Sequence, residues 1–167
     1  MSSYIVEHFN DRFTRAGTRL LRSPHAMRAP IWMYRARLGF MFGSRLLLLE
    51  HIGRRTGARR FVVLEVVGHP TPDTYVVASG FGSRSQWYRN VAANPHVRVS
   101  VAHPSAVPAE ARVLEPKQAH SVLRAYVDRH PRAWSALKPV LENTLGAPIG
   151  EDGAGLPLVQ LKLISSV

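Results

Sequence analysis

Hydrophobic and polar residues follow two different periods along this 167-residue chain. Over Tyr4–Leu21 the larger apolar residues recur at close to helical spacing and arginines occupy the other faces, which predicts a basic amphipathic helix. The Ser-Pro step at 23–24 ends it, because the residue before a proline is driven out of helical conformation. A proline at position 30 then opens an aromatic-rich stretch, which predicts a second, short helix running toward Gly43.

After Gly43 the period changes to two, the spacing of a strand with one buried face. Six short segments rich in Leu and Val are bounded by Gly, Pro, Asn or Asp, and each predicts a strand. The loops between the first three are those of an antiparallel meander. The predicted strands are Leu46–Leu49, Phe61–Val67, Thr74–Ala78, Val97–Val101, Ala109–Leu114 and Leu158–Ile164.

Two helices are predicted before the last strand, one opening at Pro116 and one running from Pro131 to a stop at Gly146. The segment 146–155 is expected to be a loop that serves as a lid or an interface. The chain is therefore expected to be one α+β domain. Residues 1–43 form its N-terminal helical segment, and residues 44–167 form a small antiparallel β-barrel or curled sheet of about six strands, with helices near 116–145.

Composition adds a strong positive charge, +11 in total, to a chain that is 46% hydrophobic. That hydrophobic fraction excludes a disordered basic tail. Residues 1–60 hold twelve arginines and three acidic residues, a net charge of +9, so the excess is almost entirely N-terminal. Codon usage in a GC-rich genome is an alternative cause of the arginine preference, but it does not explain the missing acids. The asymmetry predicts a polyanionic partner: nucleic acid, anionic lipid headgroups or a phosphorylated ligand.

Several kinds of chemistry have no candidate residues. The chain has no Cys, which excludes thiolate catalysis and Cys-ligated metals, and its eight His residues show no metal-ligand spacing. No nucleophile elbow, paired-carboxylate site or dinucleotide fingerprint is present. No apolar run reaches the length of a membrane-spanning helix, and no signal peptide is evident. We therefore expect a cytoplasmic protein, either free or attached to the cytoplasmic face of a membrane.

The loop Gly53–Arg60 is the first candidate site. Two glycines four residues apart allow a tight turn with N–H groups pointing outward, and four guanidinium groups surround it. Such a loop can cradle an anion. It is not a Walker loop, because the lysine and the following helix are missing. The alternative is a solvated hairpin tip whose arginines serve only solubility.

The segment Ser79–Asn90 is the second candidate site. Small residues at the end of a strand allow a planar ligand to approach the backbone, and aromatic rings and an amide follow nearby. The alternative is a loop leading into a short helix, with Trp87 plugging the end of the barrel.

Taken together, these segments resemble the deazaflavin-dependent nitroreductase and quinone reductase family, split β-barrel proteins abundant in actinobacteria. Gly53–Arg60 matches the family pattern Gly-Arg-(Lys/Arg)-(Thr/Ser)-Gly-x-x-Arg, and 78–80 matches Ala-Ser-Lys-Gly-Gly in part. Trp87–Pro95 matches Trp-Tyr-x-Asn-Leu-x-Ala-Asn-Pro except at the Leu position, and Trp32–Arg35 resembles the family's N-terminal Trp-Met-Tyr-Arg. The likeness runs from about residue 30 to residue 113 with the motifs in order.

The resemblance implies a split β-barrel, FMN-binding-like, that uses the reduced 8-hydroxy-5-deazaflavin coenzyme F-420 to pass a hydride to a quinone, enone or nitro compound. The phosphate and oligoglutamate tail of this cofactor would supply the polyanion. The residues that the resemblance assigns to cofactor binding are Arg54, Arg55, Thr56, Arg60, Phe61 and Val62 for the tail, Val77, Ala78, Ser79 and Gly80 for the ring, and Gln86, Trp87, Tyr88, Arg89 and Asn90 to close the site. Ser79 and Tyr88 are the candidates for a catalytic hydrogen bond or proton.

Two departures from the family pattern limit which properties of the family can be expected of this chain. Gly80 stands where a lysine is common, and Arg84 is the candidate to replace its charge. The substrate-contacting tyrosines of well-known members are missing from the stretch that follows His130-Pro131, which leaves His130 and Trp134 as the substrate candidates. Cofactor use is therefore better supported than any particular electron acceptor, and activation of nitroimidazole prodrugs is not expected to carry over.

Three alternatives stay open. The same barrel could bind FMN, haem or a fatty acid as a carrier without turnover. A nucleic-acid-binding module is favoured by net charge alone, and no stacking platform supports it, so no nucleic-acid partner is expected. The N-terminal helix either packs on the barrel or lies on an anionic membrane surface. The expected partner is a small electron acceptor, and the protein is expected to be a monomer or homodimer.

Overall fold

The computed structural model of the chain describes residues 45–101, 105–150 and 155–164. The helices predicted within residues 1–43 lie outside this part of the chain. None of the described helices is long and apolar enough to cross a membrane. The described elements are β1 (Leu46–Ile52), β2 (Arg59–Thr71), β3 (Thr74–Ala78), the 3-10 turn η3 (Gly82–Arg84), α3 (Gln86–Ala93), β4 (His96–Val101), β5 (Val107–Val113), α4 (Pro116–Arg129), α5 (Pro131–Leu145) and β6 (Leu158–Leu163).

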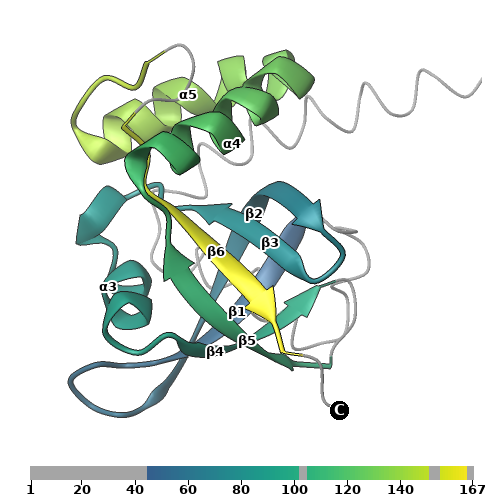
Figure 1. Cartoon of the computed structure of the whole chain (residues 1–167). Helices are drawn as coiled ribbons and strands as arrows, with labels where there is room; N and C mark the ends of the chain where they lie inside the picture. The colour runs from purple at the N-terminus through teal and green to yellow at the C-terminus, as the bar shows by residue number, and fades with distance from the viewer. Residues whose placement is uncertain (1–44, 102–104, 151–154, 165–167) are drawn as a thin grey trace, which may run out of the picture.

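The six strands form a closed antiparallel barrel in the order β1-β2-β3-β6-β5-β4, which closes through the pairing of β4 with β1 (Figure 1). The predicted α+β barrel, its six strands and the meander of the first three are therefore confirmed. β6, the last strand in the sequence, lies between β3 and β5 and pairs with both.

Strands β1 and β2 are longer than their patterns predict, β1 by the three residues up to Ile52. β2 continues through Gly68 and Pro70 to Thr71, where a loop was expected. Its pairing with β3 shifts register on both sides of Gly68, so the glycine lies at an irregularity of the strand, where glycine and proline are tolerated.

The first hydrophobic core fills the barrel. Alternate residues of each strand point inward, as Leu47 and Leu49 of β1 do, and both are fully buried. Val77 of β3 and Val159 of β6 face the same interior and are also fully buried. Trp87 of α3 belongs to this core and is 8% exposed, so the interpretation of Trp87 as a plug for the barrel is confirmed.

The second core lies between the barrel and the two long helices. Figure 1 shows α4 and α5 as a layer over one side of the barrel, near β2, β3 and β6. The outward residues Val67, Val76 and Leu158 pack there against α4 and α5. Both helices begin at a proline, and α5 ends at Gly146 with φ of 71°, so the sequence placed these boundaries correctly. Strands covered in this way are apolar on both faces, as their composition indicates.

Candidate functional site

The arginine loop (residues 53–60) joins β1 to β2 as a tight, internally bonded turn. Gly53 N–H donates to the Ala58 carbonyl at 2.9 Å, and the N–H groups of Thr56 and Gly57 donate to the Gly53 carbonyl at 3.2 and 2.8 Å. Gly57 has φ of 65°, a conformation that favours glycine. These N–H groups are used inside the turn, so the expectation that they point outward toward an anion is wrong. The arginine side chains are left as the anion-binding groups.

Helix α3 holds the first of these arginines. Arg54 Nη1 donates to Gln86 Oε1 at 3.0 Å and to Asn90 Oδ1 at 2.9 Å, and the Arg54 backbone N–H donates to the same Asn90 oxygen at 3.2 Å. Since a guanidinium has five N–H donors, Nε and Nη2 remain for a ligand. Arg54 is thus orientated by α3 before any ligand arrives.

The buried side chain of His51 contacts Asn90, the residue that orientates Arg54. Asn90 is 4% exposed, and because its oxygen accepts from Arg54, its amide nitrogen faces His51 Nδ1 at 3.3 Å. His51 is also 4% exposed, and burial, followed by the Arg60 charge, lowers its pKa despite an opposing backbone hydrogen bond. A neutral imidazole accepts the Asn90 hydrogen bond. The network therefore ties the arginine loop to the barrel core.

The remaining loop residues are exposed. Arg55, Thr56 and Arg60 lie on the surface, and Arg59 forms an ion pair with Glu50 at 3.3 Å. Exposed guanidinium groups around a rigid turn suit phosphate and carboxylate, which they bind through two parallel N–H donors. The chemistry of this donor set fits a phosphodiester with a carboxylate tail.

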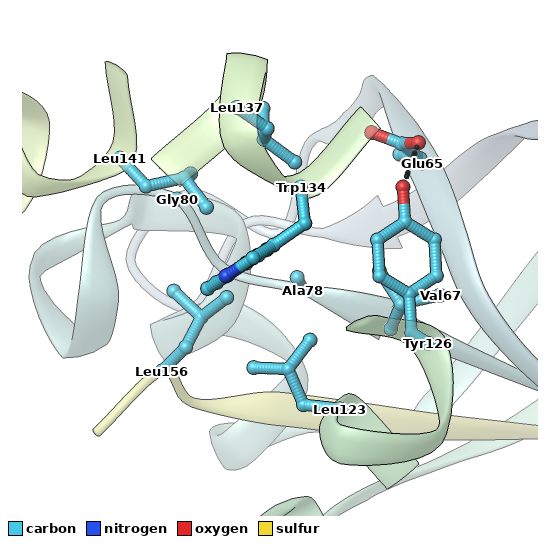
Figure 2. A pocket seen from close by; sticks show the side chains of 10 residues that line it. All are labelled: Glu65, Val67, Ala78, Gly80, Leu123, Tyr126, Trp134, Leu137, Leu141 and Leu156. Atoms are coloured by element: carbon cyan, nitrogen blue, oxygen red, sulfur yellow. Dashed lines mark hydrogen bonds between the residues drawn. The ribbon is translucent and has the colours of Figure 1, made fainter. Parts of the chain in front are cut away.

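A pocket lies on the other side of the barrel wall, between the sheet and the helices α4 and α5 (Figure 2). Its cavity measures about 80 Å³. Ligand pockets are usually about 300–1,000 Å³, so this cavity accepts one edge of a ring and not a whole tricycle. The lining residues are Glu65, Val67, Ala78, Gly80, Leu123, Tyr126, Trp134, Leu137, Leu141 and Leu156.

Two ionisable side chains stand out in this apolar lining. Tyr126 Oη donates to Glu65 Oε1 at 2.8 Å, the bond drawn in Figure 2. Arg45 Nη2 lies 3.6 Å from the same carboxylate oxygen, and the Glu65 side chain is 30% exposed. Burial, and then the neighbouring Glu65 charge, raise the pKa of Tyr126, which keeps its phenol neutral. The pocket therefore has one polar edge.

Three predicted residues meet at this pocket. Ala78 and Gly80 from the predicted ring site line it together with Trp134 from the predicted substrate site. A Cβ added to Gly80 would lie 3.1 Å from Leu141 Cδ2, so glycine permits the close approach of α5. The other substrate candidate, His130, is exposed, and its ring lies 5.2 Å from the ring of Tyr126.

Other predicted residues lie in the cores or in bonded turns. Val77 belongs to the barrel core with Trp87, and Val62 and Tyr88 are partly buried and pack against that core. Ser79 is fully buried, and its Oγ donates to the Gly82 carbonyl at 2.7 Å. Phe61 is half-buried, and Arg89 Nε donates to the Ser83 carbonyl at 2.9 Å. The structure does not bring these side chains to the pocket edge.

Arg84, the candidate to replace the missing lysine, is bonded to the end of α5. Its Nη2 donates to the Leu145 carbonyl at 2.8 Å, at the end of α5. The last carbonyls of a helix have no partner within the helix and attract a cation, which is the physical reason for this position. That Arg84 also supplies charge to a cofactor stays a prediction.

Sequence reasoning missed Glu65, Tyr126 and His51. Glu65 is the one charged residue within the apolar run Phe61–Val67, and an isolated carboxylate in an otherwise apolar strand is a usable signal. Tyr126 belongs to the apolar face of a predicted helix and reads as core. No group of three or more potential metal ligands occurs within the described ranges.

The outer face of β2 joins the two sites. Residues 62, 64 and 66 point into the barrel, so Arg59, Phe61, Val63 and Glu65 share the outer face. Glu65 is six residue steps along the strand from Arg59, about 20 Å at ~3.3 Å per residue. The arginine loop and the pocket therefore lie at two places along the same face of β2.

Fold and site together define a class: a split β-barrel with an arginine loop at one end and an apolar, helix-covered pocket further along the same strand. A family model described as F420H(2)-dependent quinone reductase matches residues 26–136, more than half of the chain. The chain belongs to this family of deazaflavin-dependent reductases, as its motifs led us to expect. No curated protein matches the sequence.

Solved structures support the fold. A protein of unknown function from Agrobacterium tumefaciens is 16% identical with a TM-score of 0.53, over 83% of this chain and 56% of that chain. A putative pyridoxamine 5'-phosphate oxidase from Listeria innocua is 14% identical with a TM-score of 0.50, over 80% and 94%. An F420-H2 dependent reductase (FDR-A) is 21% identical with a TM-score of 0.49, over 71% and 94%. At these identities the first two similarities establish the barrel fold and nothing about ligands.

Proposed function

We propose that the protein uses reduced coenzyme F-420 to reduce a quinone-type acceptor, with the tail of the cofactor at the arginine loop and the reaction beside the helix-covered pocket. The observation that carries this proposal is the family match, which spans both the arginine loop and the pocket residues from Glu65 to Trp134. Enones and nitro compounds are further acceptors of the same chemical type and belong to the same test.

The arginine loop would hold the phosphate and the carboxylates of the tail. Arg54 offers a guanidinium already orientated by Gln86 and Asn90, and Arg55 and Arg60 are exposed beside it. Pre-orientation lowers the entropy lost on binding, and a charge-assisted bond to phosphate is about twice as strong as a neutral one. The loop is therefore a binding site and takes no part in the chemistry.

The pocket would orientate reactants and exclude water. When bound, the reduced deazaflavin supplies the hydride. Ala78 and Gly80 contribute small residues to the pocket wall, and Trp134 contributes its indole from α5. Apolar walls from Leu137 and Leu141 keep water from the reacting atoms. Ser79 and Tyr88 stay predictions as sources of a catalytic hydrogen bond, and the Ser79 hydroxyl is already bonded to Gly82.

The deciding experiment is a titration of the purified protein with F-420, followed by fluorescence, and then addition of menadione to the reduced complex. We expect saturable binding and reoxidation of the cofactor that depends on the protein. Absence of binding contradicts the proposal. Binding without reoxidation by quinone, enone or nitro acceptors would instead favour the carrier function, and FMN titrated in parallel tests the alternative cofactor.

A further inference from the structure

The side-chain amide of Asn90 has one orientation that satisfies its neighbours. Its oxygen accepts two hydrogen bonds from Arg54, one from the backbone N–H at 3.2 Å and one from Nη1 at 2.9 Å. Both groups are donors only, so an amide turned the other way would place its own N–H groups against them. Asn90 is 4% exposed, so water does not replace a lost partner. The amide nitrogen therefore points away from Arg54.

The ring of His51 lies against that nitrogen. Alternate residues of β1 face into the barrel, so His51 shares the inner face with Leu47 and Leu49. Its Nδ1 lies 3.3 Å from Asn90 Nδ2. Because the amide nitrogen is a donor only, Nδ1 carries a lone pair, and the single proton of the neutral ring is on Nε2.

The surroundings of His51 favour the neutral ring. Burial lowers the pKa of His51, a backbone hydrogen bond at Ile52 opposes it, and the charge of Arg60, opposite His51 in the β1–β2 pairing, adds to the lowering. Glu50, the neighbouring carboxylate, is on the other face of β1 and forms an ion pair with Arg59 at 3.3 Å. At neutral pH the ring of His51 is therefore an acceptor for the amide and carries no charge.

We propose that His51 is a positioning residue for the anion site: the lone pair of its Nδ1 fixes the amide of Asn90, and that amide holds the Arg54 guanidinium in place for a phosphate or carboxylate. The inference rests on the proposed function in taking the arginine loop as the site of an anionic tail. His51 is itself 4% exposed and acts through Asn90. Without the lone pair the amide is free to turn, and Arg54 loses the acceptor at Nη1 and keeps only the weaker hold of the exposed Gln86 oxygen.

The free protein tests this geometry directly. Long-range proton–nitrogen NMR of the imidazole at neutral pH distinguishes the two tautomers. We expect His51 to carry its proton on Nε2 and none on Nδ1. A ring protonated at Nδ1, or at both nitrogens, would overturn the inference. The measurement needs no cofactor and no substitution.

Two substitutions at residue 51 separate the lone pair from the packing, with inorganic pyrophosphate as the anion and NMR of the loop amides as the readout. Asparagine carries an acceptor oxygen as many bonds from the backbone as Nδ1, so His51→Asn should keep the affinity within about twofold. Leucine fills space without an acceptor, so His51→Leu should weaken binding by about three- to tenfold, the effect of one lost hydrogen bond. Val159→Ala, which removes buried methyl groups from the same core, should lower stability and leave the affinity unchanged.

The side-chain Nε–H of Arg54 shows whether the effect passes through this arginine. Its NMR signal should move toward that of a free guanidinium in His51→Leu and stay in place in His51→Asn and Val159→Ala. An unmoved signal in His51→Leu contradicts the inference, and so does an equal loss of affinity in His51→Asn or Val159→Ala.

No binding of pyrophosphate would also overturn the inference, because the loop would then not be an anion site. If His51→Leu does not fold, the tautomer of the unmodified protein and the affinity of His51→Asn decide. None of these measurements uses the deazaflavin. Failure of F-420 to bind while they hold would therefore overturn the proposed function alone, and the two failures are distinguishable.

Discussion

Replacing the two neighbouring arginines of the loop one at a time tests whether the loop is a built anion site or a solvated hairpin tip. Arg54 is fixed by Gln86 and Asn90, whereas Arg55 makes no hydrogen bond or ion pair to any residue that the structure describes. Two arginines that look equivalent in sequence should therefore contribute unequally to binding.

The magnitudes follow from this difference. A pre-orientated hydrogen bond from Arg54 to a phosphate is worth about 1.5–3 kcal/mol, so Arg54→Ala should weaken F-420 binding by roughly ten- to 150-fold. Arg55 has to be ordered by the ligand and is screened by water. An exposed charge pair contributes about 0.2–1 kcal/mol, so Arg55→Ala should weaken binding by no more than about fivefold.

The assay is fluorescence titration of F-420 at several salt concentrations. Arg124→Ala is the matched control, because it removes the same charge from the exposed face of α4. Thermal unfolding of each variant shows whether the fold is intact, and we expect small changes, since Asn90 Oδ1 still accepts the backbone N–H of residue 54. If Arg55→Ala weakens binding as much as Arg54→Ala, or if Arg124→Ala equals both, pre-orientation by α3 is not the cause.

Four further predictions concern the support of the loop and the barrel. Asn90→Ala removes a buried amide that bonds Arg54 and His51, and should lower the free energy of unfolding by about 2 kcal/mol in urea titrations and weaken F-420 binding with it. The lowered pKa of His51 means that the unfolded state takes up a proton below about pH 6.5 that the folded state does not, so stability should fall from pH 7 to pH 5, and less steeply in His51→Gln. Gly57→Ala forces an alanine to φ of 65° and should cost about 1 kcal/mol of stability, detectable as a lower Tm. Trp87→Ala should cost about 3–5 kcal/mol because Trp87 fills the barrel, and an unchanged stability would return it to the candidate site residues.

The order of the elements was predictable because the spacing of hydrophobic residues and the positions of turn residues are local properties of the sequence. Six apolar segments with turn residues between them gave six strands, and prolines at 116 and 131 marked both helix starts. The ends of β2 were not predictable from Gly68 and Pro70, since the irregular pairing with β3 accommodates both residues. Such accommodation depends on the neighbouring strand, which lies outside the local pattern.

Several residues of the candidate site could be predicted from the sequence, but only some of their contacts could. The arginine loop and the group of Ala78, Gly80 and Trp134 follow from motif positions, and the structure brings the latter three together. The bond between Glu65 and Tyr126 joins residues 61 positions apart, and no local pattern predicts a contact of that range. The N-terminal helix stays a prediction, and so do its two alternative positions, packed on the barrel or bound to an anionic membrane surface. Pelleting of the protein with anionic vesicles at low salt tests the membrane alternative.

The position of β6 has a consequence for how the molecule is made. The barrel cannot close until Leu158–Leu163 has entered between β3 and β5, because this segment supplies the second neighbour of each of those strands. During synthesis the strands that precede β6 therefore carry two open sheet edges, which are sites for pairing with other chains. A nascent chain is thus most prone to aggregation just before its last strand leaves the ribosome, and any C-terminal shortening that removes β6 makes this state permanent.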